Sequence, residues 1–289
     1  MKIIEPKVEL WRQEDAKAHV ARCARVCYGK ETGNDEATVK RLINSKHWSM
    51  FRHETVYAMV PALAWQGAFG MAINKYIESP YIKWTTCHDY IYVATNANFM
   101  LDREKDNPVL WKYIHEHRVS EEEFNSCETA YNLFARWTFC VDTQISTSRE
   151  LNRVSPNNIA EMSTRYVYED GSICRPHWMT DEEVDYLNNE PIFEEWCNSH
   201  KASIYRNSCN DSFNKYKLLV DIGMHRQDAR GVLPLDTATK CIYTYSINEW
   251  RHIIDLRYYG TTGTPHPNAK IIAGMIRDNL IELGYDFRD

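Results

Sequence analysis

The residues best suited to chemistry lie together in one stretch, 148–166, which has the sequence SRELNRVSPNNIAEMSTRY. It contains Arg149, Arg153 and Arg165, two glutamates, and a final Ser-Thr-Arg-Tyr. A guanidinium group offers a planar fork of donors that matches a phosphate or the edge of an ionised base, and lysine lacks that geometry. The stretch therefore predicts a site for a small anionic ligand, with a solvated helix end held by surface ion pairs as the alternative.

Arg257 is a second candidate, because the sequence predicts that it faces the interior. It follows Trp250 and Ile254 at the i, i+4, i+7 spacing of one helix face. A buried guanidinium without a partner is costly, so it must meet a carboxylate, a carbonyl or a ligand. The alternative partners Asp255 and Glu249 project elsewhere on this helix, so we expect a ligand at Arg257.

Three further groups could contribute to the same site. Glu150 and Arg153 have the i, i+3 spacing of a helix ion pair. Arg230 precedes a turn at Pro234 and is a weak candidate by itself. The segment HWSMFRHE places His47 and Ser49 together, which suits hydrogen bonding to a polar cofactor and equally suits structural capping.

The cysteines and histidines do not predict a metal site or a nucleophile. None of the nine cysteines forms a C-x-x-C pair and no signal peptide is evident, which indicates free thiols in a reducing cytoplasm. Cys174, which has Arg175 beside it and His177 close by, is the best thiol candidate and still a weak one. Cys241 lies in an apolar, β-prone context that is typical of a core.

Composition limits the classes of partner. A net charge of −6 and a pI near 6.0 argue against nucleic acid, which demands a basic face. No apolar run approaches the roughly 18 residues that cross a bilayer, so we expect a soluble protein without a membrane partner. No G-x-G-x-x-G or phosphate-binding loop motif is present, so a dinucleotide must be held in another way.

The elements that position these residues form a helix-rich α+β pattern without the β-α-β rhythm of a parallel sheet. Residues 55–63 fit a strand or a buried helix, and 90–94 and 163–168 fit strands, the last turning Ser163 and Arg165 to one side. The predicted helices are residues 14–28, 35–45, 121–140, 144–153, 193–220, 247–259 and 268–283.

In order along the chain, five segments resemble the flavin-dependent (alternative) thymidylate synthases. ARVCYGK resembles the end of the family's first helix, with Cys27 where a serine near the flavin is frequent, and HWSMFRHE resembles its H-x-S-x-x-E-H segment, with Arg52 where the glutamate is usual. The stretch 148–166 aligns without gaps on the family signature, in which an R-H-R triplet precedes a serine and then S-x-R-Y. DARGVLPL and SINEWRHIIDLR resemble its A-R-x-x-L-P and N-x-R-E-W-R-H-x-x-x-L-R segments.

The departures from the family fall on the cofactor side. Val154 and Ser155 replace a histidine and an arginine of the triplet that serve flavin and folate. Asn248 stands where an arginine is common, and Ser246 where an asparagine is common. Loss of one charge-assisted contact weakens binding by roughly 1.5–3 kcal/mol, so a pyrimidine nucleotide site is the firmer expectation.

The resemblance implies the family's own α+β fold and a homotetramer with sites shared between subunits. It implies reductive methylation of dUMP at C5 to give dTMP, with methylenetetrahydrofolate as carbon donor, reduced FAD as hydride donor and NADPH as reductant. Arg257 would be catalytic and hold the ionised uracil edge. The implied dUMP-binding residues are Glu150, Arg153, Glu161, Ser163, Arg165, Arg230 and Arg257, and the implied FAD-binding residues are His47, Ser49, Arg153, Asn248 and His252.

Two alternatives remain open. A relative of these enzymes could methylate or hydroxymethylate another pyrimidine nucleotide, such as UMP, or the chain could bind a nucleotide without catalysis. We expect one domain over residues 1–289, in which 64–140 carry no motif of the family and form an insertion.

Overall fold

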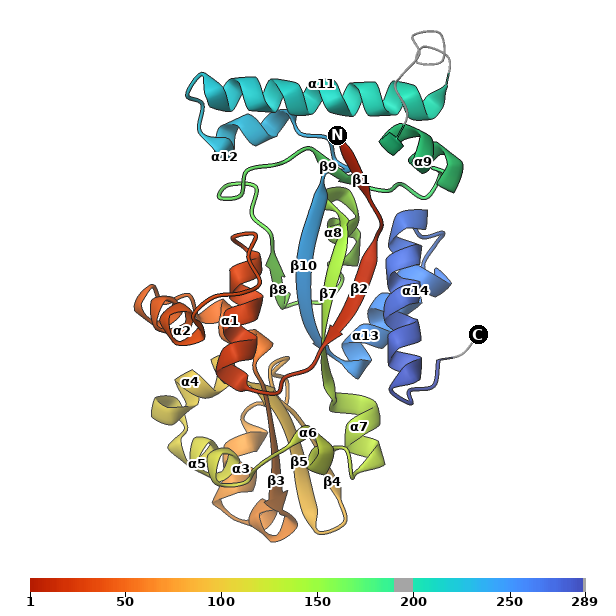
Figure 1. Ribbon diagram of the computed structural model, residues 1–289. Coiled ribbons are helices and arrows are strands. Elements are labelled where there is room, and N and C mark those ends of the chain that lie inside the picture. The colour runs from red at the N-terminus through yellow and green to blue at the C-terminus, as the bar shows by residue number, and fades with distance from the viewer. Residues whose placement is uncertain (190–199, 288–289) are drawn as a thin grey trace.

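The computed structural model describes residues 1–189 and 200–287, and it shows an elongated α+β molecule built around two four-stranded sheets (Figure 1). About 51% of the residues are helical. Strands within both main sheets pair antiparallel, and among the described residues the short pair β1–β9 is the parallel one. This confirms the helix-rich α+β class and the absence of a β-α-β rhythm.

The central sheet has the strand order β2-β7-β10-β8. Its longest pairing joins β7 to β10 along their full length, from Gln144 opposite Ala238 to Arg136 opposite Ser246. β8 covers the other edge of β10, with Glu161 opposite Cys241. The bounds of the four strands are β2 Lys7–Trp11, β7 Arg136–Gln144, β10 Ala238–Ser246 and β8 Ile159–Glu161.

Both faces of this sheet are covered, because side chains of β7 alternate between two apolar clusters. Phe139 and Val141 pack with α13 and α14, whereas Cys140 packs with α1. Polar residues at the ends of the strands therefore lie beside helix ends, where a site can form. The helices of this part are α1 Ala16–Val26, α2 Asp35–Asn44, α8 Ile145–Leu151, α13 Ile247–Ile254 and α14 Pro267–Glu282, with the 3₁₀ turn η1 Trp48–His53 and the π-helical turn η4 Asp255–Tyr259.

The second sheet, of order β4-β5-β3-β6, lies at one end of the molecule with its own helices (Figure 1). It packs apolar residues of β3 and β5 against α3, α4 and α5, and Tyr57 and Tyr92 against Phe124. Its elements are β3 Thr55–Pro61, η2 Ala62–Gln66, α3 Ala68–Asn74, β4 Lys83–Cys87, β5 Tyr90–Asn96, α4 Ala97–Asp106, α5 Pro108–Glu116, β6 Arg118–Val119, α6 Glu121–Phe124 and α7 Glu128–Phe134.

A helical cap covers the opposite end of the central sheet (Figure 1). There Ile3 and Ile173, on the paired strands β1 and β9, form an apolar cluster with Phe213. The elements are β1 Lys2–Ile4, β9 Ser172–Cys174, α9 Asp181–Asn189, α11 Lys201–Asp221, α12 Arg226–Ala229 and the 3₁₀ turn η3 Arg230–Val232.

Two predicted elements are wrong. The helix expected over 121–140 is two short helices, α6 and α7, followed by strand β7, because RWTFCVDTQ buries alternate side chains on both faces of a sheet. The strand expected over 163–168 is a turn in which Val167 donates to the Ser163 carbonyl at 2.9 Å, and the strand lies earlier, at Ile159–Glu161. The part of the predicted helix 193–220 before residue 200 lies outside the described residues.

Candidate active site

Arg257 lies at the centre of a charged cluster on the α8 side of the central sheet. Its Nε donates to the Glu150 carbonyl oxygen at 2.6 Å, and its Nη2 lies 3.1 Å from Glu150 Oε2. The same Oε2 accepts a hydrogen bond from Arg153 Nη2 at 3.1 Å, so the i, i+3 pair is confirmed. Burial, to which the charge of Arg153 adds, lowers the pKa of Arg257 from its ordinary value, and Glu150 opposes that shift.

The backbone that carries Arg257 is a π-helical turn rather than a continuation of the α-helix. α13 ends at Ile254, and η4 winds over the next five residues to Gly260. A π turn changes the phase of the helix and is frequent at functional sites. Arg257 is consequently half-buried, and its carboxylate partner is Glu150 rather than Asp255 or Glu249. Glu150, which the sequence did not indicate as a partner, therefore supplies a carbonyl and a carboxylate to Arg257, and a ligand at Arg257 stays a prediction.

Glu161 occupies a sheltered position on the same side of the sheet. Its Oε1 accepts from Ser148 Oγ at 3.0 Å and from Thr239 Oγ1 at 3.2 Å. Tyr243, two residues beyond Cys241 on β10, donates from its hydroxyl to the Ser148 carbonyl. α8, β8 and β10 thus hold the acidic residue of the signature rigidly.

The end of the signature docks on α12 and η3 in a second charged group. Arg230 Nη1 donates to Thr164 Oγ1 at 3.0 Å, and Arg165 Nη2 donates to Gln227 Oε1 at 3.4 Å. The Ser163 hydroxyl oxygen accepts a hydrogen bond from the Arg165 amide, and the Ser163 amide donates to the Cys27 carbonyl oxygen. Arg165 and Arg230 are therefore neighbours, as expected for one anion site, and both are exposed.

No hydrogen bond or ion pair between described residues links this group to the Arg257 cluster. Arg257, Glu150 and Arg153 form one group, and Arg165 and Arg230 form another, in a single protomer. Glu161 lies between the two groups in the sequence, and its hydrogen bonds go to Ser148 and Thr239 rather than to an arginine of either group.

Arg153 lies in the Arg257 cluster, whereas the other residues expected to contact FAD lie at η1 and on α13. Arg52 Nη1 donates to the Asn157 carbonyl at 3.3 Å, which joins η1, with His47 and Ser49, to the loop after α8. Asn248 lies in the first turn of α13, immediately after β10. His47, Asn248 and His252 are exposed, and Ser49 is half-buried.

Sequence analysis missed two guanidinium groups in this region. Arg52 Nε and Arg136 Nε are buried and have no hydrogen-bond partner among the described residues. Arg136 lies at the start of β7, opposite Ser246, and gave no signal because that segment was expected to be helix. Flavin offers carbonyl, ring nitrogen and phosphate oxygen acceptors, so a donor set of arginine, asparagine, serine and histidine fits this cofactor.

Val154 shows the effect of one departure from the family. It stands where the signature that the stretch resembles has a histidine, and it packs against the apolar cluster under α13 and α14. Ser155 is exposed.

Burial disfavours the thiolate form of the three cysteines singled out from the sequence, Cys27, Cys174 and Cys241. Cys174 is fully buried, and burial raises the pKa of its thiol to about 12. Burial likewise raises the pKa of Cys27, and it raises that of Cys241 well above the ordinary value. Within residues 1–189 and 200–287, no cluster of three histidine, cysteine or acidic side chains is arranged to hold a metal.

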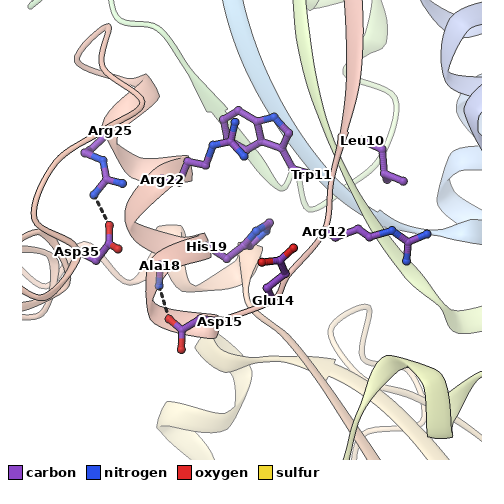
Figure 2. A pocket seen from close by; sticks show the side chains of 10 residues that line it. All are labelled: Leu10, Trp11, Arg12, Glu14, Asp15, Ala18, His19, Arg22, Arg25 and Asp35. Carbon is purple, nitrogen blue, oxygen red and sulfur yellow. Dashed lines mark hydrogen bonds and ion pairs between the residues drawn. The ribbon is translucent and has the colours of Figure 1, made fainter.

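A hollow of about 550 Å³ lies elsewhere, along α1 (Figure 2). The Arg22 guanidinium stacks on the Trp11 ring at 3.4 Å, Arg25 Nη1 pairs with Asp35 at 2.6 Å, and His19 bonds to Thr138. Its guanidinium groups therefore already have partners. None of the site residues expected from sequence lines it. A search of the described helices finds no span long and apolar enough for a bilayer.

Comparison with known proteins finds a family match over the part of the chain that contains α8, β8, β10 and η4. The family model described as thymidylate synthase complementing protein matches residues 110–278, which include 148–166 and Arg257. A flavin-dependent thymidylate synthase of Thermosipho melanesiensis is 26% identical over 155 residues, which is 53% of this chain and 63% of that protein. This chain thus matches less than two thirds of that relative's length.

Two solved structures of a UMP/dUMP methylase PolB from Streptomyces cacaoi were also found. The one bound with 5-Br dUMP has 17% sequence identity and a TM-score of 0.46, over 98% of this chain and 93% of that one. The one bound with 5-Br UMP has 16% identity and a TM-score of 0.45, over 98% and 92%. Because the family model covers more than half of its length, this chain belongs to the thymidylate synthase complementing protein family.

Proposed function

We propose that this protein methylates C5 of a pyrimidine nucleotide, dUMP to dTMP, with methylenetetrahydrofolate as carbon donor and reduced FAD as hydride donor. The observation that carries the proposal is the Arg257 cluster. Arg257 Nε and Nη2 are fixed by Glu150, while its Nη1 donates to no described residue. A fixed cation with a free donor edge suits a uracil ring that becomes anionic during attack from C5.

The other residues of the signature have separate tasks in this proposal. Arg165 and Arg230 bind the nucleotide phosphate, because two exposed neighbouring guanidinium groups match a doubly charged anion. Ser163 adds a hydroxyl donor. Glu161, whose carboxylate is held by Ser148 and Thr239, orients the base or the sugar.

FAD would be held by His47, Ser49, Arg153, Asn248 and His252, with Arg52 adding a donor beside them. Bound flavin would supply the hydride that completes the methyl group. The buried, protonated thiols fit this proposal, because Arg257 rather than a cysteine activates the base.

Turnover and absorbance of the purified protein test the proposal. We expect flavin absorbance after FAD is added, and conversion of dUMP to a product heavier by one methyl group when methylenetetrahydrofolate and NADPH are present. Protein that takes up no FAD and leaves dUMP unchanged would contradict it.

The same assay separates the alternatives. Faster turnover of UMP than of dUMP would indicate that UMP is the substrate. A product heavier by a hydroxymethyl group would indicate that the reaction is hydroxymethylation. Tight dUMP binding in calorimetry without turnover would indicate a nucleotide-binding homologue, an outcome that Val154 and Ser155 make worth testing.

We further propose a homotetramer with shared sites and NADPH as reductant. The chain would act as a single domain. Residues 64–109 of the 64–140 segment lie before the family match and would be an addition to the family's core, whereas residues 110–140 lie within that match. The 64–140 segment contains most of the second sheet, and it also contains the first half of β7, which pairs with β10 in the central sheet.

A further inference from the structure

A pocket of about 160 Å³ lies where the two sheets meet the start of α13. One side is formed by the second sheet and α7, and the other by the junction of β10 and α13. Junctions between such units are frequent places for small-molecule sites. The lining residues used below are Tyr81, Leu133, Phe134, Arg136, Asn248 and Glu249.

Arg136 is the unusual member of this lining. Arg136 is only 9% exposed, and its guanidinium forms no ion pair with any described carboxylate. Nη2 donates to the Arg52 carbonyl at 3.1 Å, whereas Nε, which is buried, and Nη1 have no hydrogen-bond partner among the described residues. A buried guanidinium with unused donors costs free energy unless an acceptor joins it.

The remaining polar groups indicate which acceptor fits. Glu249 is close enough to act on the charge of Arg136, and it also accepts hydrogen bonds from the Ser246 amide and hydroxyl at 2.7 Å. A free anion would meet this carboxylate and be repelled. A ring that carries a carbonyl next to an N–H would satisfy both, since the carbonyl accepts from Arg136 and the N–H donates to Glu249 or to the Asn248 side chain.

The walls of the pocket suit a flat ring. Tyr81, Leu133 and Phe134 give it aromatic and aliphatic surfaces, and Arg52 lies over the Tyr81 ring at 5.3 Å. Apolar walls with a few converging polar groups are the usual form of a small-molecule site. The larger hollow beside α1 lacks this property, because its buried and half-buried cations are already paired.

We propose that this pocket binds the planar nitrogen heterocycle of a cofactor through an amide edge, with Arg136 as the positioning residue and Leu133 and Tyr81 as walls. The inference rests on the proposed function, in which a flavin and a pterin ring both take part and share this edge. It adds residues of the 64–140 segment to the cofactor site.

Equilibrium binding of riboflavin, FAD and folic acid tests the pocket. We expect Arg136→Gln to weaken binding of one ring probe about tenfold or more, as for loss of a charged hydrogen bond. A loss for riboflavin and FAD together assigns the ring to flavin, and a loss for folic acid assigns it to pterin. Leu133→Trp, at a residue 37% exposed, should fill the slot and give the same loss if Arg136→Gln does not fold.

Arg118→Gln is the matched control. Arg118 lies on β6 of the second sheet, outside the pocket lining, and its Nη1 lies 3.9 Å from Glu54 Oε1. It should bind all three probes as the wild type does. The proposal is overturned if neither pocket variant weakens riboflavin or folic acid, if only FAD is weakened, which indicates a phosphate site, or if the wild type binds no probe.

Binding and turnover of dUMP by the same preparations separate this inference from the proposed function. If the wild type turns over dUMP and both variants bind the ring probes as the wild type does, the proposed pocket is contradicted and the proposed reaction is not. If ring binding depends on Arg136 but no pyrimidine nucleotide is turned over, the proposed reaction is contradicted and the proposed pocket is supported.

Discussion

Arg257 has a charge whose position is fixed by the protein before any ligand arrives. Two of its three guanidinium nitrogen atoms, Nε and Nη2, contact Glu150. The planar group therefore also fixes the direction of the third nitrogen atom, Nη1. We expect Arg257→Gln to lower kcat for methylation about 100-fold or more, because one preorganised charge at a developing anion contributes on that order. Turnover assays and circular dichroism on the same preparation measure activity and folding.

Arg251→Gln is the control for this substitution. Arg251 lies on α13, just before η4; its Nη1 donates to the Asp286 carbonyl and its guanidinium lies over the Phe287 ring. Its activity should stay close to that of the wild type. Equal losses in the two variants would show that Arg257 acts through helix stability and not on the base.

A buried chain of hydrogen bonds joins two histidines across the central sheet. His19 bonds to Thr138 at 3.2 Å, Thr138 to Thr244 at 2.8 Å, and Thr244 to His53 at 2.8 Å. Burial lowers the pKa of His19 from 6.5 to about 4 and that of His53 to about 3. Both rings are therefore neutral near pH 7, and each lacks the proton that it would bind in the unfolded chain below pH 6.5.

These pKa shifts predict acid sensitivity. Below pH 6.5 the unfolded chain binds more protons than the folded one, so the free energy of unfolding falls by roughly 1 kcal/mol per pH unit for each histidine until its folded pKa is reached. Buried carboxyl groups with raised pKa values, such as Glu54 and Asp142, act in the opposite direction. The comparison must therefore be made between the wild type and His19→Gln.

Urea unfolding of these two proteins between pH 7.5 and 4.5 measures the difference. Glutamine keeps a hydrogen-bonding group near Thr138 and does not titrate, so the variant should lose less stability than the wild type as the pH falls. Parallel curves for the two proteins would show that His19 takes up its proton with the same affinity in the folded and unfolded states.

At the scale of elements, the π-helical turn η4 depends on Gly260. This residue has φ +72°, and a Cβ there would lie 2.9 Å from the Gly263 carbonyl oxygen and 2.9 Å from Pro265 Cδ. Gly260→Ala should lower the free energy of unfolding by about 1–3 kcal/mol and raise KM for dUMP, since it disturbs the turn that holds Arg257. Chemical denaturation and initial rates measure these effects.

Gly231→Ala serves for comparison. Its added Cβ would meet nothing within 4 Å, and its backbone is not in the left-handed region. Its stability should match that of the wild type. A Gly260→Ala variant as stable as Gly231→Ala would mean that the turn relaxes at little cost.

Elements with a clear period and clear ends could be predicted from sequence. Both ends of α1, α2, α8 and α14 lie within two residues of the expected bounds. β7 could not be separated from the helix before it, because the apolar spacing of α6 and α7 leads directly into a strand buried on both faces. The π turn left no mark in the 3.6-residue period.

The candidate site was predictable where residue type alone was informative. The pairing of Glu150 with Arg153 follows from helix spacing, whereas the contact between Glu150 and Arg257 joins residues 107 apart. Arg136 could not be identified, because its importance depends on burial and on the lack of a carboxylate partner. Those properties come from the packing of the second sheet on the end of β7 and not from local sequence.

At the scale of the whole molecule, the proposed phosphate and base residues form two groups in one protomer. Arg165 and Arg230 are exposed on one side of the signature, and Arg257 with Glu150 lies at another cluster. Oligomers in which one subunit's patch faces a different patch of its neighbour can complete such divided sites. This arrangement is the physical reason for proposing shared sites.

Mixing of two inactive variants tests whether subunits share the site. Arg230→Ala and Arg257→Gln should each be inactive alone. If one site takes Arg230 from one subunit and Arg257 from another, co-expressed or exchanged subunits in equal amounts regain roughly a quarter of the wild-type activity, because that share of sites receives both intact residues at random. If both arginines of a site came from the same chain, mixing would restore nothing, and each protomer would have to bring its two clusters together by itself.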